Sequence, residues 1–151
     1  MNVLVAVDES NEAKHALAYA TEIVAAVDGS ITVVHVVDPV VYDEGGAEPI
    51  TTLADAEQRL ILENIEETER RGLDVLENAV EFGEERDVDV DIEGELLYGD
   101  PVTEIADYAE SEGIDAIYVG HRGRSERAEL MLGSVAKAIV ERATVPVTVV
   151  R

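Results

Sequence analysis

Two patterns of apolar and polar residues alternate along the chain, one typical of strands and one typical of helices. Residues 2–7 and 31–37 form short runs rich in β-branched side chains without polar alternation, which is typical of strands buried on both faces. Between the two runs, apolar residues recur at helical spacing, with Asp8 or Ser10 in position to cap the start of a helix. Strand, helix and strand in this order predict one parallel β-α-β unit with a right-handed crossover.

The alternation continues to the carboxyl end after a loop over 38–52. A long amphipathic helix is predicted over 53–86, with carboxylates on its polar face. Its expected apolar stripe comprises Leu60, Ile61, Ile65, Leu73, Leu76, Val80 and Phe82. The later predicted elements are a strand over 88–97, a helix that starts at Asp100 and Pro101 and ends near Gly113, a strand over 116–119, a helix over 134–142 and a strand over 146–150.

Five strands that alternate with four helices define the fold class. The pattern predicts a single α/β domain over residues 1–151, built as a doubly wound open sheet of five mostly parallel strands with helices on both faces. This arrangement is Rossmann-like. Pro146 opens the last strand and has no N–H to donate to a neighbouring strand. We therefore expect the fifth strand at an edge of the sheet.

Charge is the most unusual feature of the composition. The formal net charge is −23 at pH 7, and the basic residues are nearly all arginine, with Lys14 and Lys137 as the two lysines. The acids are interleaved with the apolar pattern, which indicates a solvated acidic surface and not a disordered tail. Such a surface suits molar salt, where the Debye length falls to about 3 Å, so we expect a halophilic source; an acidic mesophilic protein is the alternative. The negative charge argues against nucleic acid as a partner.

Two absences from the sequence narrow the chemistry further. There is no cysteine, which excludes disulfides, thiolate metal sites and a cysteine nucleophile. The first apolar run ends at Asp8, too early for a secretory signal or a membrane span. We therefore expect a cytoplasmic protein that does not insert into membranes.

The loops after the first and fourth strands form the expected ligand site, because doubly wound sheets bind ligands where the strand order reverses. The second of these loops has the spacing Gly120-x2-Gly123-x9-Gly133-Ser134. Glycines permit positive φ and close backbone approach, while Ser134 and the first amides of the following helix can donate to phosphate oxygens. The spacing therefore predicts a phosphate cradle.

The placement of charge supports the same site independently. From residue 113 onward the chain has six basic residues against four acidic ones, a net charge of +2, so residues 1–112 carry −25. Positive charge thus gathers where phosphate is expected. The alternative is that these arginines pair with acids on the adjacent surface, where ion pairs are common and contribute little.

Four motifs and the glycine loop resemble the universal stress protein family over essentially the whole chain. The motifs are VAVDES at 5–10, HVVD at 35–38, GDP at 99–101 and VPVTVVR at 145–151, and the glycine spacing is similar to that of the family's ATP-binding branch. The resemblance implies an adenine nucleotide α-hydrolase-like fold that binds ATP, with or without Mg²⁺. It implies that the adenine and ribose pocket is lined by Ala6, Val7, Asp8 and Val36, and that the ribose and phosphates are held by Val119, Gly120, Arg122, Gly123, Gly133, Ser134 and Val135.

Some polar residues of this site have a second interpretation. Asp8 can accept hydrogen bonds from ribose hydroxyls or the adenine amino group, or it can cap the first helix, and the two roles are compatible. His35 is expected to be satisfied in the core or at its rim. His15 and His121 lack the partner spacing of a metal site, and His121 could touch phosphate.

The sequence predicts nucleotide binding without rapid turnover. It lacks the Gly-Lys-Ser/Thr of a P-loop, and no nucleophile, general base or paired metal carboxylates stand out. We expect no catalytic residues, no protein-held metal, and a regulatory role in the stress response through an unidentified partner. A slow Mg²⁺-dependent ATPase and a ligand-free dimeric adaptor are the alternatives. The resemblance also implies a homodimer through the carboxyl-terminal strand, whose apolar edge invites pairing.

Overall fold

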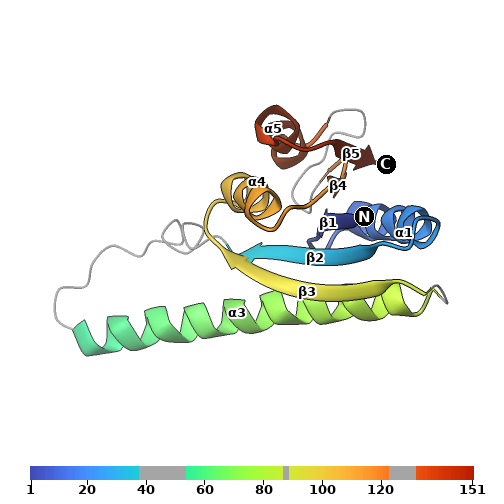
Figure 1. The fold of residues 1–151 in the computed structure, drawn as a ribbon. Coiled ribbons are helices and arrows are strands. Elements are labelled where there is room, and N and C mark those ends of the chain that lie inside the picture. The colour runs from blue at the N-terminus through green and yellow to red at the C-terminus, as the bar shows by residue number, and fades with distance from the viewer. Residues whose placement is uncertain (38–53, 87–88, 123–131) are drawn as a thin grey trace.

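The computed structural model describes residues 1–37, 54–86, 89–122 and 132–151, and over 54–64 it describes the backbone alone. Five strands form one sheet in the order β3-β2-β1-β4-β5, and every neighbouring pair is parallel (Figure 1). The strands are β1 (Asn2–Ala6), β2 (Ser30–Val37), β3 (Asp91–Tyr98), β4 (Ala116–Gly120) and β5 (Val147–Val150). This order confirms the doubly wound sheet and the edge position of β5. The predicted loop over 38–52 lies outside the described residues.

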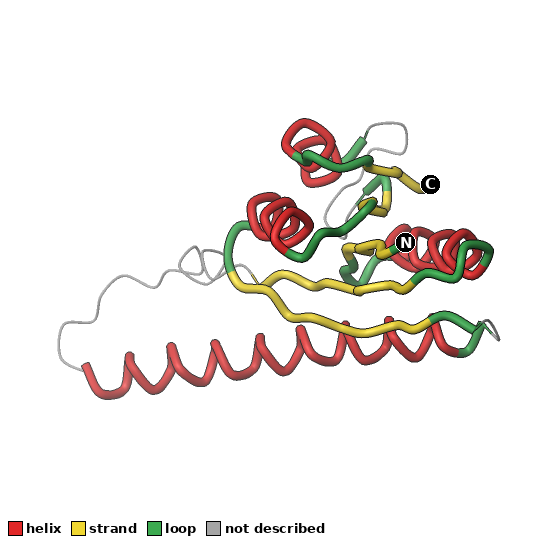
Figure 2. The backbone as a smooth tube through the Cα atoms, in the orientation of Figure 1, coloured by secondary structure: helices red, strands yellow, loops and turns green. Residues whose placement is uncertain are grey.

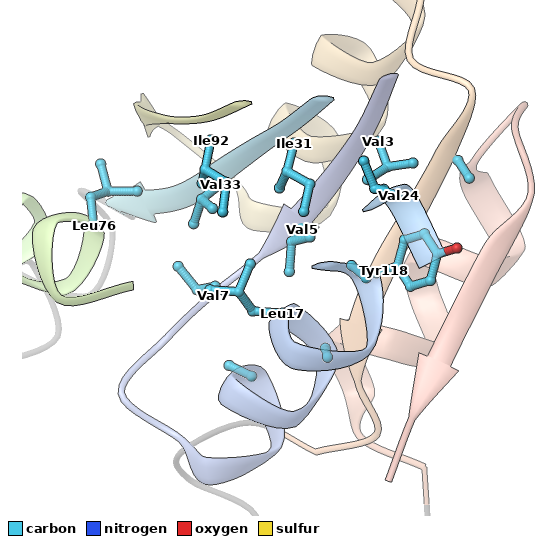
Figure 3. Packing of buried hydrophobic residues seen from close by; sticks show 14 of the residues in the cluster. Val3, Val5, Val7, Leu17, Val24, Ile31, Val33, Leu76, Ile92 and Tyr118 are labelled. Atoms are coloured by element: carbon cyan, nitrogen blue, oxygen red, sulfur yellow. The ribbon is translucent and has the colours of Figure 1, made fainter. Parts of the chain in front are cut away.

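In the described part of the chain, helices cover both faces of the sheet (Figures 1 and 2). They are α1 (Asn11–Ala25), α3 (Ala54–Glu84), α4 (Pro101–Ser111) and α5 (Ser134–Arg142). Side chains alternate across β1: Val3 and Val5 belong to the core beneath α1 and α3, whereas Leu4 belongs to the core beneath α4 and α5. Figure 3 shows the first core, where Leu17 of α1 and Leu76 of α3 lie over the sheet. Burial on both faces explains why β1 and most of β2 lack polar alternation.

Two helix starts follow the sequence signals closely. α1 begins after Ser10, whose hydroxyl accepts a hydrogen bond from the Ala13 N–H at 3.1 Å. α4 begins after Asp100, whose carboxylate accepts a hydrogen bond from the Thr103 N–H at 2.9 Å, with Pro101 in the first turn. The bond from the Thr103 backbone is the main reason that the pKa of Asp100 is lowered. Both caps fix helix starts at the carboxyl edge of the sheet, where the ligand is expected.

The expected apolar stripe of α3 is wrong at Ile65 and Leu73, which are 47% and 51% exposed. The helix instead approaches the sheet through small residues: an added Cβ at Gly72 would lie only 2.9 Å from Cδ1 of Leu96 in β3. Leu76 is buried as expected. The amino-terminal part of α3 also extends past the carboxyl ends of β2 and β3 (Figure 1), so helical periodicity alone overestimates how much of this helix is covered.

Candidate functional site

The order of the strands reverses between β1 and β4: β2 and β3 follow on the far side of β1, and β5 follows on the far side of β4. A cavity of about 250 Å³ lies at the carboxyl ends of these two strands. It is slightly below the range of about 300–1,000 Å³ typical of small-molecule sites. Its position is the one where doubly wound sheets bind ligands.

The described residues of the predicted site all line this cavity. They are Ala6, Val7, Asp8, Val36, Val119, Gly120, Arg122, Gly133, Ser134 and Val135. Gly123 lies outside the described residues. The lining residues that the sequence did not predict are Ser10, Ala13, Val34, His35, Pro101, Ile105, Ala136 and Ile139.

Hydrogen bonds from β2 hold the turn between β1 and α1 on one side of the cavity. The Val7 N–H donates to the Val34 carbonyl, and the Val7 carbonyl lies 2.9 Å from Nδ1 of His35. Because a carbonyl can only accept, Nδ1 of His35 carries the proton. Asp8 Oδ1 accepts a hydrogen bond from the Ser10 N–H at 2.9 Å. Ser10 is therefore the cap of α1, Asp8 supports the turn before it, and His35 is a satisfied rim residue as expected.

Close packing shapes the opposite side of the cavity, where β4 ends. A Cβ at Gly120 would lie 2.8 Å from the carbonyl carbon of Glu12 and 3.0 Å from the Ala13 nitrogen. Because both neighbours are backbone atoms of α1, they cannot move aside as a flexible side chain would. Gly120 thus allows the first turn of α1 to approach β4. A glycine is needed at this position because the two backbones approach closely, and its φ is not positive.

The start of α5 forms the third part of the cavity wall. Gly133 is the residue before the helix, with φ −61° and ψ 152°, and it provides no side-chain cap. Any residue can adopt this backbone conformation, so Gly133 does not use the positive φ that a glycine permits. The first-turn amides of Val135 and Ala136 have no acceptor within the helix by α-helix geometry. Together with the helix dipole, they favour an anion at this end of the cavity.

Arg122 brings a positive charge to the same wall. Its side chain is 16% exposed, whereas that of Arg142, paired with Asp107 at 3.1 Å, is 48% exposed. The Nε–H of Arg122 donates to Nε2 of His121 at 2.9 Å. A guanidinium nitrogen lies 3.8 Å from a carboxylate oxygen of Glu12, which is beyond hydrogen-bond reach. Pairing with acids therefore applies to both arginines, closely for Arg142 and through a longer contact for Arg122, and Arg122 also lines the cavity.

The cavity combines two chemical surfaces. Aliphatic side chains such as Val36, Ile105 and Ile139 line part of the wall, and a helix start and an arginine line another part. An apolar wall with a few polar groups is the usual composition of a cofactor site. Such a cavity suits a ligand with a flat, weakly polar body and an anionic end.

The sequence contained a signal for two of the missed residues. Pro101 and Ile105 enter the cavity from α4, which starts at the carboxyl end of β3 directly after the GDP motif. In the sequence this motif predicts a helix start and contributes to the family resemblance, and a helix start at this edge of the sheet also lies near the ligand. Ala136 and Ile139 show the helical spacing of a face that points inward.

A model of the universal stress protein family matches residues 1–151. The chain belongs to this family. It is 32% identical over 151 residues to the universal stress protein YxiE of Bacillus subtilis, an alignment that covers 99% of the chain and 97% of YxiE. Its fold is similar to that of the universal stress protein UspA from Lactobacillus plantarum, with a TM-score of 0.80, 26% identity, and coverage of 100% of the chain and 97% of UspA.

Two further universal stress protein structures share the fold and contain adenine nucleotides. One is a complex with cAMP, with a TM-score of 0.65, 22% identity, and coverage of 100% of the chain and 96% of that protein. The other is the Archaeoglobus fulgidus protein with dAMP, with a TM-score of 0.65, 23% identity, and coverage of 100% and 98%. At these identities the likeness concerns the fold.

Two other kinds of feature are absent from the residues of this family member that the structure describes. Among the described helices, none is long and apolar enough to cross a membrane. Within the same part of the chain, no three His, Asp or Glu side chains are grouped so that they could hold a metal ion.

Proposed function

We propose that this chain binds an adenine nucleotide, with ATP as the specific ligand, in the cavity between β1 and β4. The single observation that carries the proposal is the convergence of the predicted contact residues: each one that the structure describes lines the same cavity. These residues come from four separate segments of the sequence. Their convergence at the switch point is what a nucleotide site in this fold requires.

Each side of the cavity would bind a different part of the nucleotide. Ala6, Val7 and Val36 would contact adenine and ribose, and the Asp8 carboxylate would accept hydrogen bonds from ribose hydroxyls or the adenine amino group. The start of α5 and the Arg122 guanidinium would face the phosphates, together with Gly123 from the sequence motif. The universal stress proteins solved with cAMP and dAMP support an adenine nucleotide as the class of ligand.

We propose that nucleotide binding is regulatory and that hydrolysis is slow. The chain lacks a P-loop sequence, and the bound nucleotide would change a surface that a partner recognises in the stress response. Mg²⁺ would be held by the phosphates. Phosphate release well above about 0.01 per second would favour an ATPase instead, since working enzymes commonly turn over at about 1 per second or faster.

The chain is also proposed to form a homodimer through β5. This strand lies at the edge of the sheet, with β4 on one side, and its residues Val147–Val150 are half-buried in the single chain. An apolar edge strand of this kind readily pairs with another chain. Light scattering in concentrated KCl should give the mass of a dimer, and a stable monomer at micromolar protein would contradict this part of the proposal.

Val135 and Val140 allow a matched test of the nucleotide site. Both lie on α5 and have similar exposure, 44% and 48%, but Val135 lines the cavity in the first turn whereas Val140 lies in the last. We expect Val135→Asp to weaken ATP binding about tenfold, because a carboxylate near the phosphates repels them. Val140→Asp carries the same charge and should bind ATP like the natural chain.

Calorimetric ATP titration of both variants, after removal of bound nucleotide, provides the readout. Circular dichroism should confirm that both are folded. Equal ATP affinity for folded Val135→Asp, Val140→Asp and the unmodified protein would contradict the assignment of phosphate to the start of α5. A loss of the same size in both variants would show a general effect of net charge instead of a site.

A further inference from the structure

The hydrogen bond between Arg122 and His121 determines the protonation of the histidine. The Nε–H of Arg122 can only donate, and it lies 2.9 Å from Nε2 of His121. Nε2 must therefore accept, which places the imidazole proton on Nδ1. If Nε2 were protonated, its N–H would face the Nε–H of Arg122, and no hydrogen bond could form between them. His121 is thus present as one neutral tautomer while this contact exists.

The second nitrogen of the same ring shows that the contact is made at a cost. Nδ1 of His121 is buried and has no hydrogen-bond partner among the residues that the structure describes. A buried donor without an acceptor costs about 1–3 kcal/mol. Among the described contacts of the ring, the hydrogen bond that Nε2 accepts from Arg122 is the one that favours this orientation.

The backbone of His121 provides a fixed base for this acceptor. Its N–H donates to the Val150 carbonyl of β5 at 2.8 Å, and its carbonyl accepts from the Gly133 N–H at 2.7 Å. The residue is therefore attached on one side to the edge strand and on the other to the start of α5. Both attachments are independent of the side chain, so removal of the imidazole should leave the local backbone in place.

Other described contacts leave the direction of Arg122 open. Glu12 attracts the guanidinium from 3.8 Å but does not form a hydrogen bond with it. Attraction without a hydrogen bond does not fix the plane of a guanidinium. The bond to His121 is the directional contact. Arg122 lines the cavity, and its orientation there depends on its neighbour in the sequence.

We infer that His121 is a positioning residue for the nucleotide site: it orients the Arg122 guanidinium toward the phosphates and so makes the cavity selective for nucleotides over nucleosides. This inference rests on the proposed nucleotide site and assigns a further residue to it. His121 itself does not line the cavity described here and acts through Arg122.

The test compares the binding of ATP with that of adenosine. A residue that positions Arg122 toward the phosphates should affect ATP binding alone, because adenosine has no phosphates. We expect His121→Leu to weaken ATP binding about tenfold and to leave adenosine binding unchanged, since the lost hydrogen bond involves a charged group. His121→Gln offers an amide oxygen near the position of Nε2 and should restore most of the ATP affinity. Adenosine is measured by competition against ATP in the same buffer.

Arg122 provides an independent second arm of the test. Arg122→Lys keeps the positive charge but removes the Nε–H from which Nε2 of His121 accepts. We expect the same loss of ATP affinity as in His121→Leu, with adenosine affinity unchanged. Adding His121→Leu to Arg122→Lys should then cost little more, because contacting residues are not additive. Arg142→Lys, an arginine of the exposed pair with Asp107, is the matched control and should change neither affinity.

Several outcomes would overturn the inference. Equal losses for ATP and adenosine in His121→Leu would show a structural role, and fully additive losses in the double variant would show that the two residues act separately. If His121→Leu does not fold, Arg122→Lys decides alone: unchanged ATP affinity there contradicts the inference. An unmodified protein that binds no adenine nucleotide would remove the proposed function as well, whereas normal binding with no effect of His121→Leu removes this inference only.

Discussion

The two strands that meet at the cavity support it in different ways. At the end of β1, hydrogen bonds fix the turn: the Val7 N–H donates to the Val34 carbonyl, and the Val7 carbonyl accepts from His35. At the end of β4, close packing supports the cavity wall, because the first turn of α1 lies against Gly120 with no room for a side chain. The difference is that the wall at the end of β1 can lose one hydrogen bond at a limited cost in stability. The wall at the end of β4 has no room for even one added methyl group.

The largest expected effect is at the close-packed wall. Gly120→Ala places a methyl group within 3.0 Å of α1 backbone atoms, and we expect a loss of about 2–3 kcal/mol in the free energy of unfolding. Gly94→Ala is the matched control, because its nearest neighbour to an added Cβ is a methyl of Val80 at 3.4 Å. Denaturant unfolding in concentrated KCl measures both. Equal stabilities for the two variants would contradict the steric account of Gly120.

A smaller effect is expected at the hydrogen-bonded wall. His35→Ala leaves the Val7 carbonyl without its donor, which should cost about 1 kcal/mol of stability. It should also weaken ATP and adenosine binding by a similar factor, because Val7 faces the base and ribose in the proposed complex. His35→Asn can place an amide N–H near the position of Nδ1 and should recover most of the loss.

His35→Ala and His121→Leu together sharpen the comparison. The two histidines have opposite hydrogen-bonding roles toward the cavity: His35 donates to a backbone carbonyl, and His121 accepts from an arginine. We expect the His35 variant to affect both ligands and the His121 variant to affect ATP alone. The same ratio of ATP to adenosine affinity in both variants would show that the cavity has no separate base and phosphate sides.

The smallest expected effect concerns Asp100, which caps the helix that supplies Pro101 to the cavity. Its pKa is lowered from the usual 3.8, mainly by the hydrogen bond from the Thr103 backbone. A lowered pKa in the folded state contributes stability above the unfolded pKa, and this stability is lost as the pH falls through the lowered value. Asp100 is exposed, so the contribution is small.

Asp100→Asn keeps a capping side chain but removes the titration. We expect the stability difference between the natural protein and this variant to shrink as the pH falls from 7 to about 3. Denaturant unfolding at both pH values in the same salt provides the measurement. A difference that grows toward low pH would contradict the assigned direction.

Much of the fold could be predicted from the sequence, because it depends on local signals. Unbroken β-branched runs marked the central strands, Ser10, Asp100 and Pro101 marked helix starts, and Pro146 marked the edge strand. The apolar stripe of α3 could not be read correctly, since its contact with the sheet uses Gly72 where the pattern suggested Leu73. Whether a helix approaches through a glycine or a leucine is decided by the partner surface, which lies far away in the sequence.

The site was predictable where its residues lie in motifs. The strand ends and the glycine spacing indicate the loops after β1 and β4, and the individual contact residues follow from the family resemblance. Ile105 was not, because it enters the cavity from α4 after a long crossover. Gly120 was assigned to a ligand contact, and its packing against the Glu12 backbone became visible only when α1 and β4 were placed together.

ATP binding by the stripped protein tests the central claim most directly. The purified chain is unfolded and refolded to remove nucleotide, dialysed into concentrated KCl, and titrated with ATP by calorimetry. The account predicts saturable binding of about one ATP per chain, because the cavity between β1 and β4 occurs once in each chain. No heat with ATP, ADP or AMP in a folded sample, with or without Mg²⁺, would contradict it.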